Sequence, residues 1–326
     1  MIDFVQFTHQ RRRVASPTRL NASRITQVFT DRRTSLSKSG STKKRPHPSF
    51  FSISPERLGH GTDIKVEIVE TEDDIYHDFA RVMFNEIRKN NAAGKLTVFI
   101  LPVGPVGQYK RLARLCNLEG VTCGNLVCIN MDEYCTDDGK DWIPYDNPLS
   151  FRRYMDGQFY NLLDRNKRVK DKNKIFPDPR NLREVPQRIA GLGGVDICFG
   201  GIGVLGHIAF NEPPEPGEQV NPAEFKRRPT RVLALNRETR LINSVTAANG
   251  WVEAIPRKAV TVGMKEILGS RAVRIYMNRL WQPAIVRKFI HGPITPFCPA
   301  SFLQEHPDVK VTITGYAAQI PAPKLR

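Results

Sequence analysis

Three polar residues with acid–base side chains follow apolar segments of the sequence. The acidic pair Asp132 and Glu133 begins one residue after the segment 125–130, which is rich in Val, Cys and Ile, and His207 follows the apolar segment 195–200. A carboxyl group in a partly desolvated environment holds its proton more strongly than in water, and an imidazole exchanges its proton near neutral pH. These residue types indicate general acid–base catalysis.

Neighbouring residues in an extended segment point to opposite faces. Only one of the carboxylates of Asp132 and Glu133 can therefore face a common crevice, and that one is the candidate base. Acidic residues at strand ends are more often solvated or structural than catalytic, so both interpretations stay open on this segment alone.

His207 lies in a glycine-rich stretch, residues 200–213. The G-x-G-x-x-G spacing of its glycines is typical of dinucleotide-binding loops, but that fingerprint opens a long helix, and here prolines follow within a few residues. We therefore expect no nicotinamide cofactor. Glu212 is near enough in sequence to orient the imidazole, although a lone histidine is more often structural. The glycines concerned are Gly201, Gly203 and Gly206.

A third loop, Pro102–Gly107, stands between an apolar segment and an amphipathic one. Gly104 and Gly107 let a ligand approach the backbone, and the first turn of the following helix offers free N–H groups to an anion such as a sugar phosphate. Pro105 has no N–H to donate, so a tight turn without a ligand is an equal alternative.

Short β-branched segments alternate with amphipathic ones from residue 63 onward, which predicts a parallel sheet covered by helices on both faces. The clearest helix begins after Thr71, with Asp74 placed to complete its cap, and buries Ile75, Phe79, Val82 and Ile87. A second helix spans about Gly107 to Leu118. The expected strands are 64–69, 95–101, 125–130, 195–200, 231–236, 259–263, 272–277 and 309–314.

The expected fold is thus α/β, a doubly wound, mostly parallel Rossmann-like sheet. In such sheets ligands bind beyond the carboxyl ends of the strands, where the three loops lie. We expect one domain at residues 62–326 after a disordered basic tail at residues 1–61.

The formal net charge of +16 is concentrated near the N-terminus. Residues 1–60 hold twelve Lys and Arg against Asp3, Asp31 and Glu56, and they show no periodic apolar face. An organelle transit peptide, a solvated extension and a start codon set too early all remain open. Because neither interleaved aromatic residues nor a binding motif accompanies the charge, we do not expect a nucleic-acid partner.

Six cysteines without a Cys-x-x-Cys pair favour reduced thiols in a cytoplasmic protein. Their spacing matches no common zinc site. The longest apolar segments are far shorter than the roughly 20 residues that a membrane helix needs, so we expect no membrane partner.

Two segments of the sequence resemble those of a known family. Asn-Met-Asp-Glu-Tyr at 130–134 and Gly-His-Ile-Ala-Phe-Asn-Glu-Pro at 206–213 resemble the signature segments of glucosamine-6-phosphate deaminases. Further similarity at 238–243, 255–263 and 298–307 extends it over nearly everything after residue 62. The related 6-phosphogluconolactonases share the fold but not these two segments together.

The resemblance implies a role for each candidate. Asp132 would carry a proton from C2 to C1 of the open-chain amino sugar, His207 would open the pyranose ring, and Glu212 would orient His207. Isomerisation and hydrolysis would yield fructose 6-phosphate and ammonia without a metal or cofactor, in a homo-oligomer. The implied substrate-binding residues are Gly104, Gly107, Met131, Gly201, Gly203 and Gly206.

The sequence also departs from that pattern. Leu205 stands where the family has an Asp two residues before the histidine, and the phosphate loop has no Ser or Thr hydroxyl. Val245 and Gln282 stand where an Arg and a Lys usually hold the phosphate. Three arginines could bind the phosphate in their place: Arg240, Arg274 and Arg279. In the phosphate loop, apolar residues stand where the family has hydroxyl groups: Val103, Pro105 and Val106.

These departures leave two alternatives to the deaminase. One is an isomerase or deaminase of a different sugar derivative, which includes unphosphorylated sugars. The other is a non-catalytic sugar-binding regulator whose basic tail contacts nucleic acid.

Overall fold

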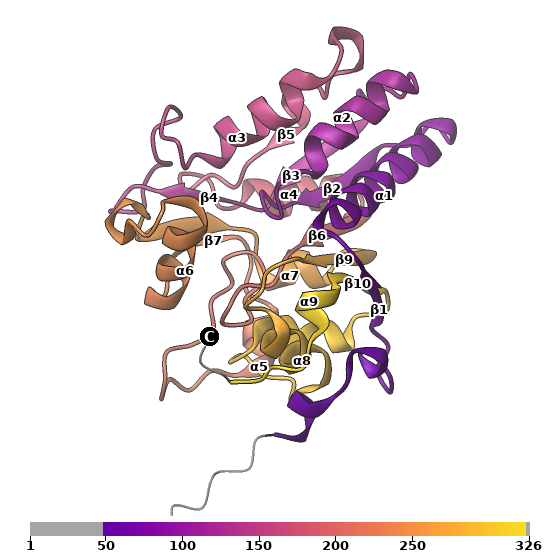
Figure 1. Ribbon diagram of the computed structural model, residues 1–326. Helices are drawn as coiled ribbons and strands as arrows, with labels where there is room; N and C mark the ends of the chain where they lie inside the picture. The colour runs from indigo at the N-terminus through magenta and orange to yellow at the C-terminus, as the bar shows by residue number, and fades with distance from the viewer. Residues whose placement is uncertain (1–47, 324–326) are drawn as a thin grey trace, which may run out of the picture. The chain divides into compact units, whose positions relative to one another are not determined.

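The protein is described by a computed structural model that covers residues 48–323 (Figure 1). Seven parallel strands form the main sheet in the order β1-β10-β9-β6-β2-β3-β5. The predicted parallel α/β sheet is confirmed. The strands are β1 (Lys65–Val69), β2 (Thr97–Leu101), β3 (Leu126–Asn130), β5 (Lys174–Ile175), β6 (Ile197–Gly200), β9 (Ala272–Met277) and β10 (Val309–Thr314).

A second, antiparallel sheet lies beside the first and has the order β4-β8-β7 (Figure 1). Its strands are β4 (Asp132–Cys135), β8 (Lys258–Thr261) and β7 (Arg231–Ala234). All eight predicted strands are present, but β7 and β8 belong to this second sheet, and β4 and β5 were not predicted. Residue periodicity indicates a strand without indicating its partner.

Helices cover both faces of the main sheet, as a doubly wound fold requires. In β2, Phe99 and Leu101 belong to a core cluster that includes residues of α1, α2 and α3, whereas Val98 and Ile100 belong to a cluster that includes residues of α4, α7 and α8. This alternation follows from the two-residue period of a strand. The helices are α1 (Glu72–Ala92), α2 (Gln108–Leu118), α3 (Phe151–Gln158), α4 (Glu184–Gly191), α5 (Pro222–Lys226), α6 (Arg237–Ala247), α7 (Met264–Leu268), α8 (Pro283–His291) and α9 (Gly315–Ala318).

The predicted cap of α1 is present. The Asp74 backbone N–H donates to the Thr71 hydroxyl at 3.2 Å, and the Thr71 N–H donates to the Asp74 carboxylate at 2.9 Å. Ile75, Phe79 and Ile87 are buried beneath the helix, while Val82 is half-buried at its edge. α2 also begins as predicted, directly after Gly107. These two helices fix the loop that lies between β2 and α2.

Residues 48–61, which the sequence analysis assigned to the tail, pack against α8. The buried guanidinium of Arg287 donates to the carbonyl oxygens of Ile53, Pro283, Ala318 and Gln319 at 2.7–3.1 Å. The folded part of the chain therefore begins before residue 62. The rest of the expected tail, residues 1–47, lies outside the described residues.

All six cysteines are buried and unpaired. Within residues 48–323, no helix combines the length and the apolar character needed to cross a membrane.

Candidate active site

A cavity of about 330 Å³ lies at the carboxyl ends of β2, β3, β6 and β9. Its walls come from the loop at 102–106, from Met131 and Asp132 at the start of β4, from residues 201–203 and His207, from α6, and from the loop at 278–282. Its volume is in the lower part of the range of small-ligand pockets, roughly 300–1,000 Å³. The structure thus brings together three loops that lie far apart in the sequence.

Asp132 and Glu133 point in opposite directions, as the alternation of a strand predicts. After β3, the Met131 N–H donates to the Leu101 carbonyl and the Val262 N–H donates to the Met131 carbonyl, so the chain passes from the main sheet into β4. Asp132 lines the cavity, whereas Glu133 is fully buried behind it. Asp132 is therefore the carboxylate that can reach a ligand.

Burial raises the pKa of Asp132, and the negative charge of Glu133 raises it further, to about 8. Both effects disfavour the ionised carboxylate. The ionised form that is present has a correspondingly high proton affinity, which suits a base that removes a proton from carbon.

His207 is held from behind by Glu212. Its Nδ1 lies 3.0 Å from Glu212 Oε2, and the Thr239 hydroxyl of α6 lies 3.4 Å from the same nitrogen. A carboxylate on Nδ1 favours the tautomer that leaves Nε2 free. The other carboxylate oxygen of Glu212 is buried without a partner among the described residues.

Gly203 provides the space for the imidazole. A Cβ placed on Gly203 would lie 1.9 Å from His207 Nε2, which is well inside van der Waals contact. Of the other predicted binding residues, Gly104, Met131 and Gly201 also line the cavity.

Gly107 and Gly206 do not line the cavity and instead shape its loops. Gly107, at φ +128°, precedes α2 and leaves space for the ring of Tyr76. Gly206, at φ +84°, packs against Cys298, and its carbonyl accepts the Ala300 N–H. Both positive φ values favour glycine.

Arg279 is the one Lys or Arg among the described residues that line this cavity. Arg240 is directed away, towards the carbonyls of Val252 and Ile255, and Arg274 forms an ion pair with Asp308 at 3.0 Å. Of the three substitutes that the sequence suggested, the structure places Arg279 at the cavity.

Gln282 lines the cavity and fixes the loop that carries Arg279. Its Oε1 accepts the Arg279 backbone N–H at 2.8 Å, and its Nε2 donates to the Ile202 carbonyl at 3.0 Å. Val245 is exposed on α6 and does not line the cavity. The cavity wall at 102–106 contributes Val103, Pro105 and Val106 and no hydroxyl group.

α6 supplies polar groups that were not predicted from the sequence. Thr239 contacts His207, and the Asn243 amide donates to the Tyr134 hydroxyl at 3.0 Å beside the cavity. The one signal for these residues was the resemblance of residues 238–243 to the family. No local sequence pattern connects α6 to His207, because the helix begins about 30 residues after the histidine.

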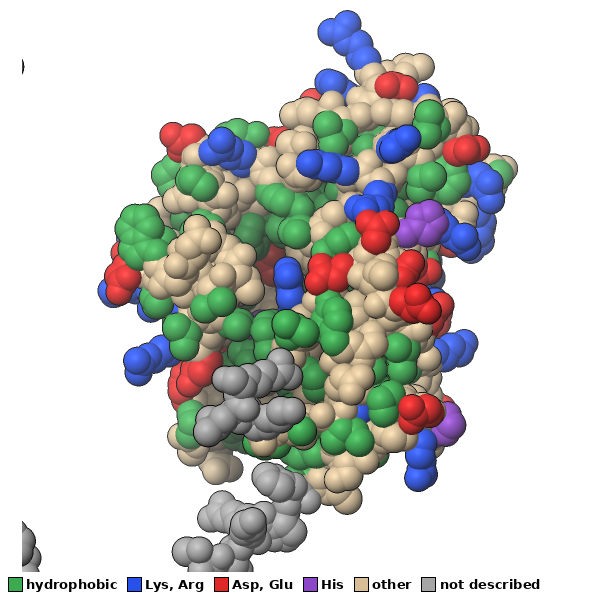
Figure 2. Space-filling view, in the orientation of Figure 1, with side chains coloured by type: hydrophobic (Ala, Val, Ile, Leu, Met, Phe, Trp, Pro, Cys, Tyr) green, Lys and Arg blue, Asp and Glu red, His purple; other side chains and the backbone are tan. Residues whose placement is uncertain are grey.

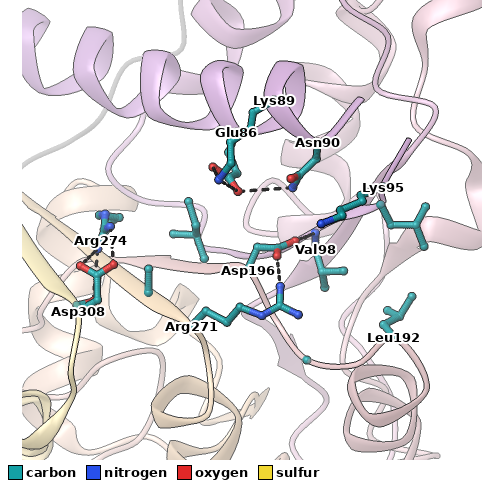
Figure 3. A pocket seen from close by; sticks show the side chains of 14 residues that line it. Glu86, Lys89, Asn90, Lys95, Val98, Leu192, Asp196, Arg271, Arg274 and Asp308 are labelled. Atoms are coloured by element: carbon teal, nitrogen blue, oxygen red, sulfur yellow. Dashed lines mark hydrogen bonds and ion pairs between the residues drawn. The ribbon is translucent and has the colours of Figure 1, made fainter. Parts of the chain in front are cut away.

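A second and larger hollow, about 850 Å³, lies at the amino ends of β2, β6 and β9 (Figure 3). Six of its seven charged side chains form ion pairs, Arg274 with Asp308, Arg271 with Asp196, and Lys89 with Glu86, and the seventh is Lys95. It contains no histidine or cysteine. Because its carboxylates are paired with cations and it has no imidazole or thiol, we assign the chemistry to the cavity of Asp132 and His207.

Residues 48–323 contain no cluster of three or more His, Cys, Asp or Glu side chains arranged to hold a metal ion.

No protein-family model matches the chain, but individual relatives do. Glucosamine-6-phosphate deaminase 1 of Bacillus subtilis is 31% identical over 265 residues, which are 79% of this chain and 99% of the relative. The glucosamine-6-phosphate deaminase of Caenorhabditis elegans is 29% identical over 248 residues, 74% of this chain and 86% of the relative.

Solved structures agree with these relatives. A monomeric glucosamine-6-phosphate deaminase superposes with a TM-score of 0.67 at 29% identity, over 79% of this chain and all of that one. The 6-phosphogluconolactonase of Trypanosoma brucei, at 14% identity and a TM-score of 0.59 over 79% of this chain and 98% of its own, shares the fold alone. The chain belongs to the glucosamine-6-phosphate deaminase family.

Proposed function

We propose that the protein converts glucosamine 6-phosphate and water into fructose 6-phosphate and ammonia. The observation that carries the proposal is the joint placement of Asp132 and the His207–Glu212 pair around one cavity of about 330 Å³. Two acid–base groups on separate strand ends are what an aldose–ketose isomerisation needs.

His207 opens the sugar ring in this proposal. With its Nδ1 proton directed to Glu212, the neutral imidazole presents the Nε2 lone pair. Nε2 takes the proton of the anomeric hydroxyl, and water gives a proton to the ring oxygen as the C1–O5 bond breaks, which leaves His207 protonated for the next step. The product is the open-chain aldehyde, in which the C2 proton is acidic enough for a carboxylate to remove.

Asp132 then moves the proton between carbons. The ionised carboxylate takes the C2 proton, the C2–H electron pair forms the C1–C2 double bond, and O1 receives a proton from His207. Asp132 returns its proton to C1 while the nitrogen lone pair forms a C2–N double bond. Water adds at C2 and ammonia leaves, which gives the ketose.

Arg279 is the cation that we assign to the 6-phosphate. It is half-buried and appears in no ion pair among the described residues, so its charge is available to a ligand. Gln282 holds the backbone of Arg279 through a 2.8 Å hydrogen bond. Replacing Arg279 by Gln removes the charge, and we expect KM for glucosamine 6-phosphate to rise at least tenfold with a smaller change in kcat.

A substrate panel tests this assignment. Glucosamine 6-phosphate, glucosamine and mannosamine 6-phosphate are each incubated with the protein, and ammonia and ketose are measured. The proposal predicts turnover of glucosamine 6-phosphate at roughly 1–10³ per second. Faster turnover of glucosamine than of its 6-phosphate would favour the second candidate, a deaminase of unphosphorylated sugars, which the apolar walls at Val103 and Val106 support.

A sugar-binding regulator is the candidate from another class. On the face seen in Figure 2, Lys and Arg side chains are interspersed with Asp and Glu, which is not the extended basic patch that nucleic acid needs. Salt-sensitive DNA or RNA binding that disappears when residues 1–60 are removed would support the regulator. The cytoplasmic location, the homo-oligomer and the disordered tail remain predictions.

A further inference from the structure

Glu133 carries the most heavily hydrogen-bonded carboxylate near the candidate site, and no step of the proposed reaction uses it. It is fully buried and accepts five hydrogen bonds. Its donors are the backbone N–H groups of Tyr134, Phe151 and Arg152, the Ser150 hydroxyl and the Arg152 Nε, at 2.8–3.1 Å. Each of these five contacts is a donor directed at the carboxylate, so the side chain is held in one orientation.

These contacts join β4 to the first turn of α3. Ser150 caps α3, and the N–H groups of Phe151 and Arg152 are the free donors of that turn. The negative side chain therefore lies at the positive end of the helix dipole. Because Glu133 directly follows Asp132, anchoring Glu133 also fixes the direction of the neighbouring side chain.

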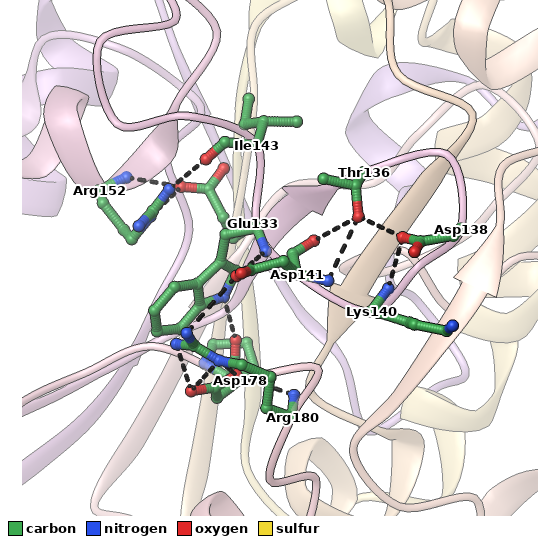
Figure 4. A network of polar contacts seen from close by, with 11 residues as sticks. Glu133, Thr136, Asp138, Lys140, Asp141, Ile143, Arg152, Asp178 and Arg180 are labelled. Carbon is green, nitrogen blue, oxygen red and sulfur yellow. Dashed lines mark hydrogen bonds and ion pairs between the residues drawn. The ribbon is translucent and has the colours of Figure 1, made fainter.

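Arg152 is itself held in place (Figure 4). Its guanidinium donates to the Ile143 carbonyl and lies 4.5 Å from the ring centroid of Trp142, and the Arg180 guanidinium lies 4.6 Å from the same centroid. Its side chain is 18% exposed. The cation that neutralises Glu133 is thus fixed by carbonyl and aromatic contacts.

We propose that Glu133 is a positioning residue for Asp132: it anchors β4 to α3, and with Arg152 it sets the charge beside the candidate base. This inference rests on the proposed function. The carboxylate adds a negative charge one residue from Asp132, and Arg152 offsets part of it. The proton affinity of the base is therefore set by this pair as well as by burial.

Other charged and titratable groups also face Asp132. Tyr109 of α2 and Tyr134 of β4 interact with it, and His207 and Arg279 share its cavity. The variants below leave these four groups unchanged. A shift in the titration of Asp132 is then attributable to Glu133 and Arg152.

The test compares three variants by the pH dependence of kcat/KM for glucosamine 6-phosphate. Glu133→Gln removes the neighbouring negative charge, and we expect the acid limb to move to lower pH by roughly one unit. Arg152→Met removes the offsetting cation, and we expect the limb to move to higher pH. Glu133→Asp keeps the charge but shortens the side chain, so kcat falls while the limb stays in place.

Ser150→Ala is the matched control, because it removes one donor to Glu133 without changing any charge. A loss of kcat in all variants without opposite movement of the limb in Glu133→Gln and Arg152→Met would overturn the inference and leave Glu133 a structural residue.

A second measurement does not depend on activity. The unfolding free energies of Glu133→Gln and of Glu133→Gln/Asp132→Asn are compared from pH 5 to 9, since their difference follows the titration of Asp132. The same comparison is made between the wild type and Asp132→Asn. We expect Asp132 to titrate at lower pH in the pair that carries Glu133→Gln than in the wild-type pair. Equal titration in the two pairs would overturn the inference. A wild-type protein without deaminase activity would refute the proposed function, while this second measurement would still decide the role of Glu133.

Discussion

Replacement of Asp132 by Asn is predicted to stabilise the protein in alkaline solution while it removes the candidate base. The folded-state pKa of Asp132 is about 8, whereas an aspartate in an unfolded chain has a pKa of ~3.9. Between these values the folded protein binds a proton that the unfolded chain does not. The stability from this group is therefore complete below about pH 4 and is lost as the pH rises through about 8.

The size of the effect follows from that difference. About four pH units correspond to on the order of 5 kcal/mol, which is an upper bound because Asp132 lines a cavity and is not enclosed on all sides. Asn is neutral and close in shape, so its unfolding free energy is free of this loss. The stability of Asp132→Asn relative to wild type should rise by at most about 1.4 kcal/mol per pH unit between pH 5 and 8, and then level off.

Urea unfolding at intervals from pH 5 to 9 measures this difference directly. Asp137→Asn is the matched control, since Asp137 is an exposed aspartate five residues along the chain and does not line the cavity. A constant difference between Asp132→Asn and wild type over the whole range would refute the burial argument, as would a difference that falls with rising pH.

Three further changes test other parts of the account. Gly203→Ala should lower kcat/KM at least a hundredfold, because its Cβ would lie 1.9 Å from His207 Nε2; wild-type kinetics would show that this nitrogen does not act from its present position. Thr239→Val should lower kcat/KM less than tenfold, since its contact of 3.4 Å is long and Glu212 remains; a loss as large as that of His207→Gln would contradict this ranking. Arg287→Met should lower the unfolding free energy by about 3 kcal/mol in urea while KM is unchanged, because it deprives four carbonyl oxygens of their donor and Arg287 does not line the cavity; unaltered stability would show that residues 48–61 are held by other contacts.

Local signals in the sequence predicted local structure well. The Thr71–Asp74 cap of α1 and the start of α2 after Gly107 depend on residues within one turn, and both are present. The strands were also recognisable, because each is a short apolar or alternating segment. The opposite directions of Asp132 and Glu133 followed from strand geometry alone.

What the sequence could not predict depends on contacts between distant segments. No periodicity shows that β7 and β8 leave the parallel sheet to pair with β4, or that Arg287 binds a segment more than 200 residues earlier. For the same reason Thr239 was missed. Arg279 could be named only as one of three candidates, because the sequence does not place the end of a long side chain.

The central claim is that Asp132 transfers the proton in a deamination of glucosamine 6-phosphate. Its most direct test is the rate at which the wild-type protein and Asp132→Asn form fructose 6-phosphate and ammonia at pH 8, with His207→Gln measured beside them. The account predicts turnover by the wild type and a rate at least a hundredfold lower in Asp132→Asn. A wild-type protein that forms neither product, or an Asp132→Asn protein that keeps a rate within a few-fold of the wild type, would contradict it.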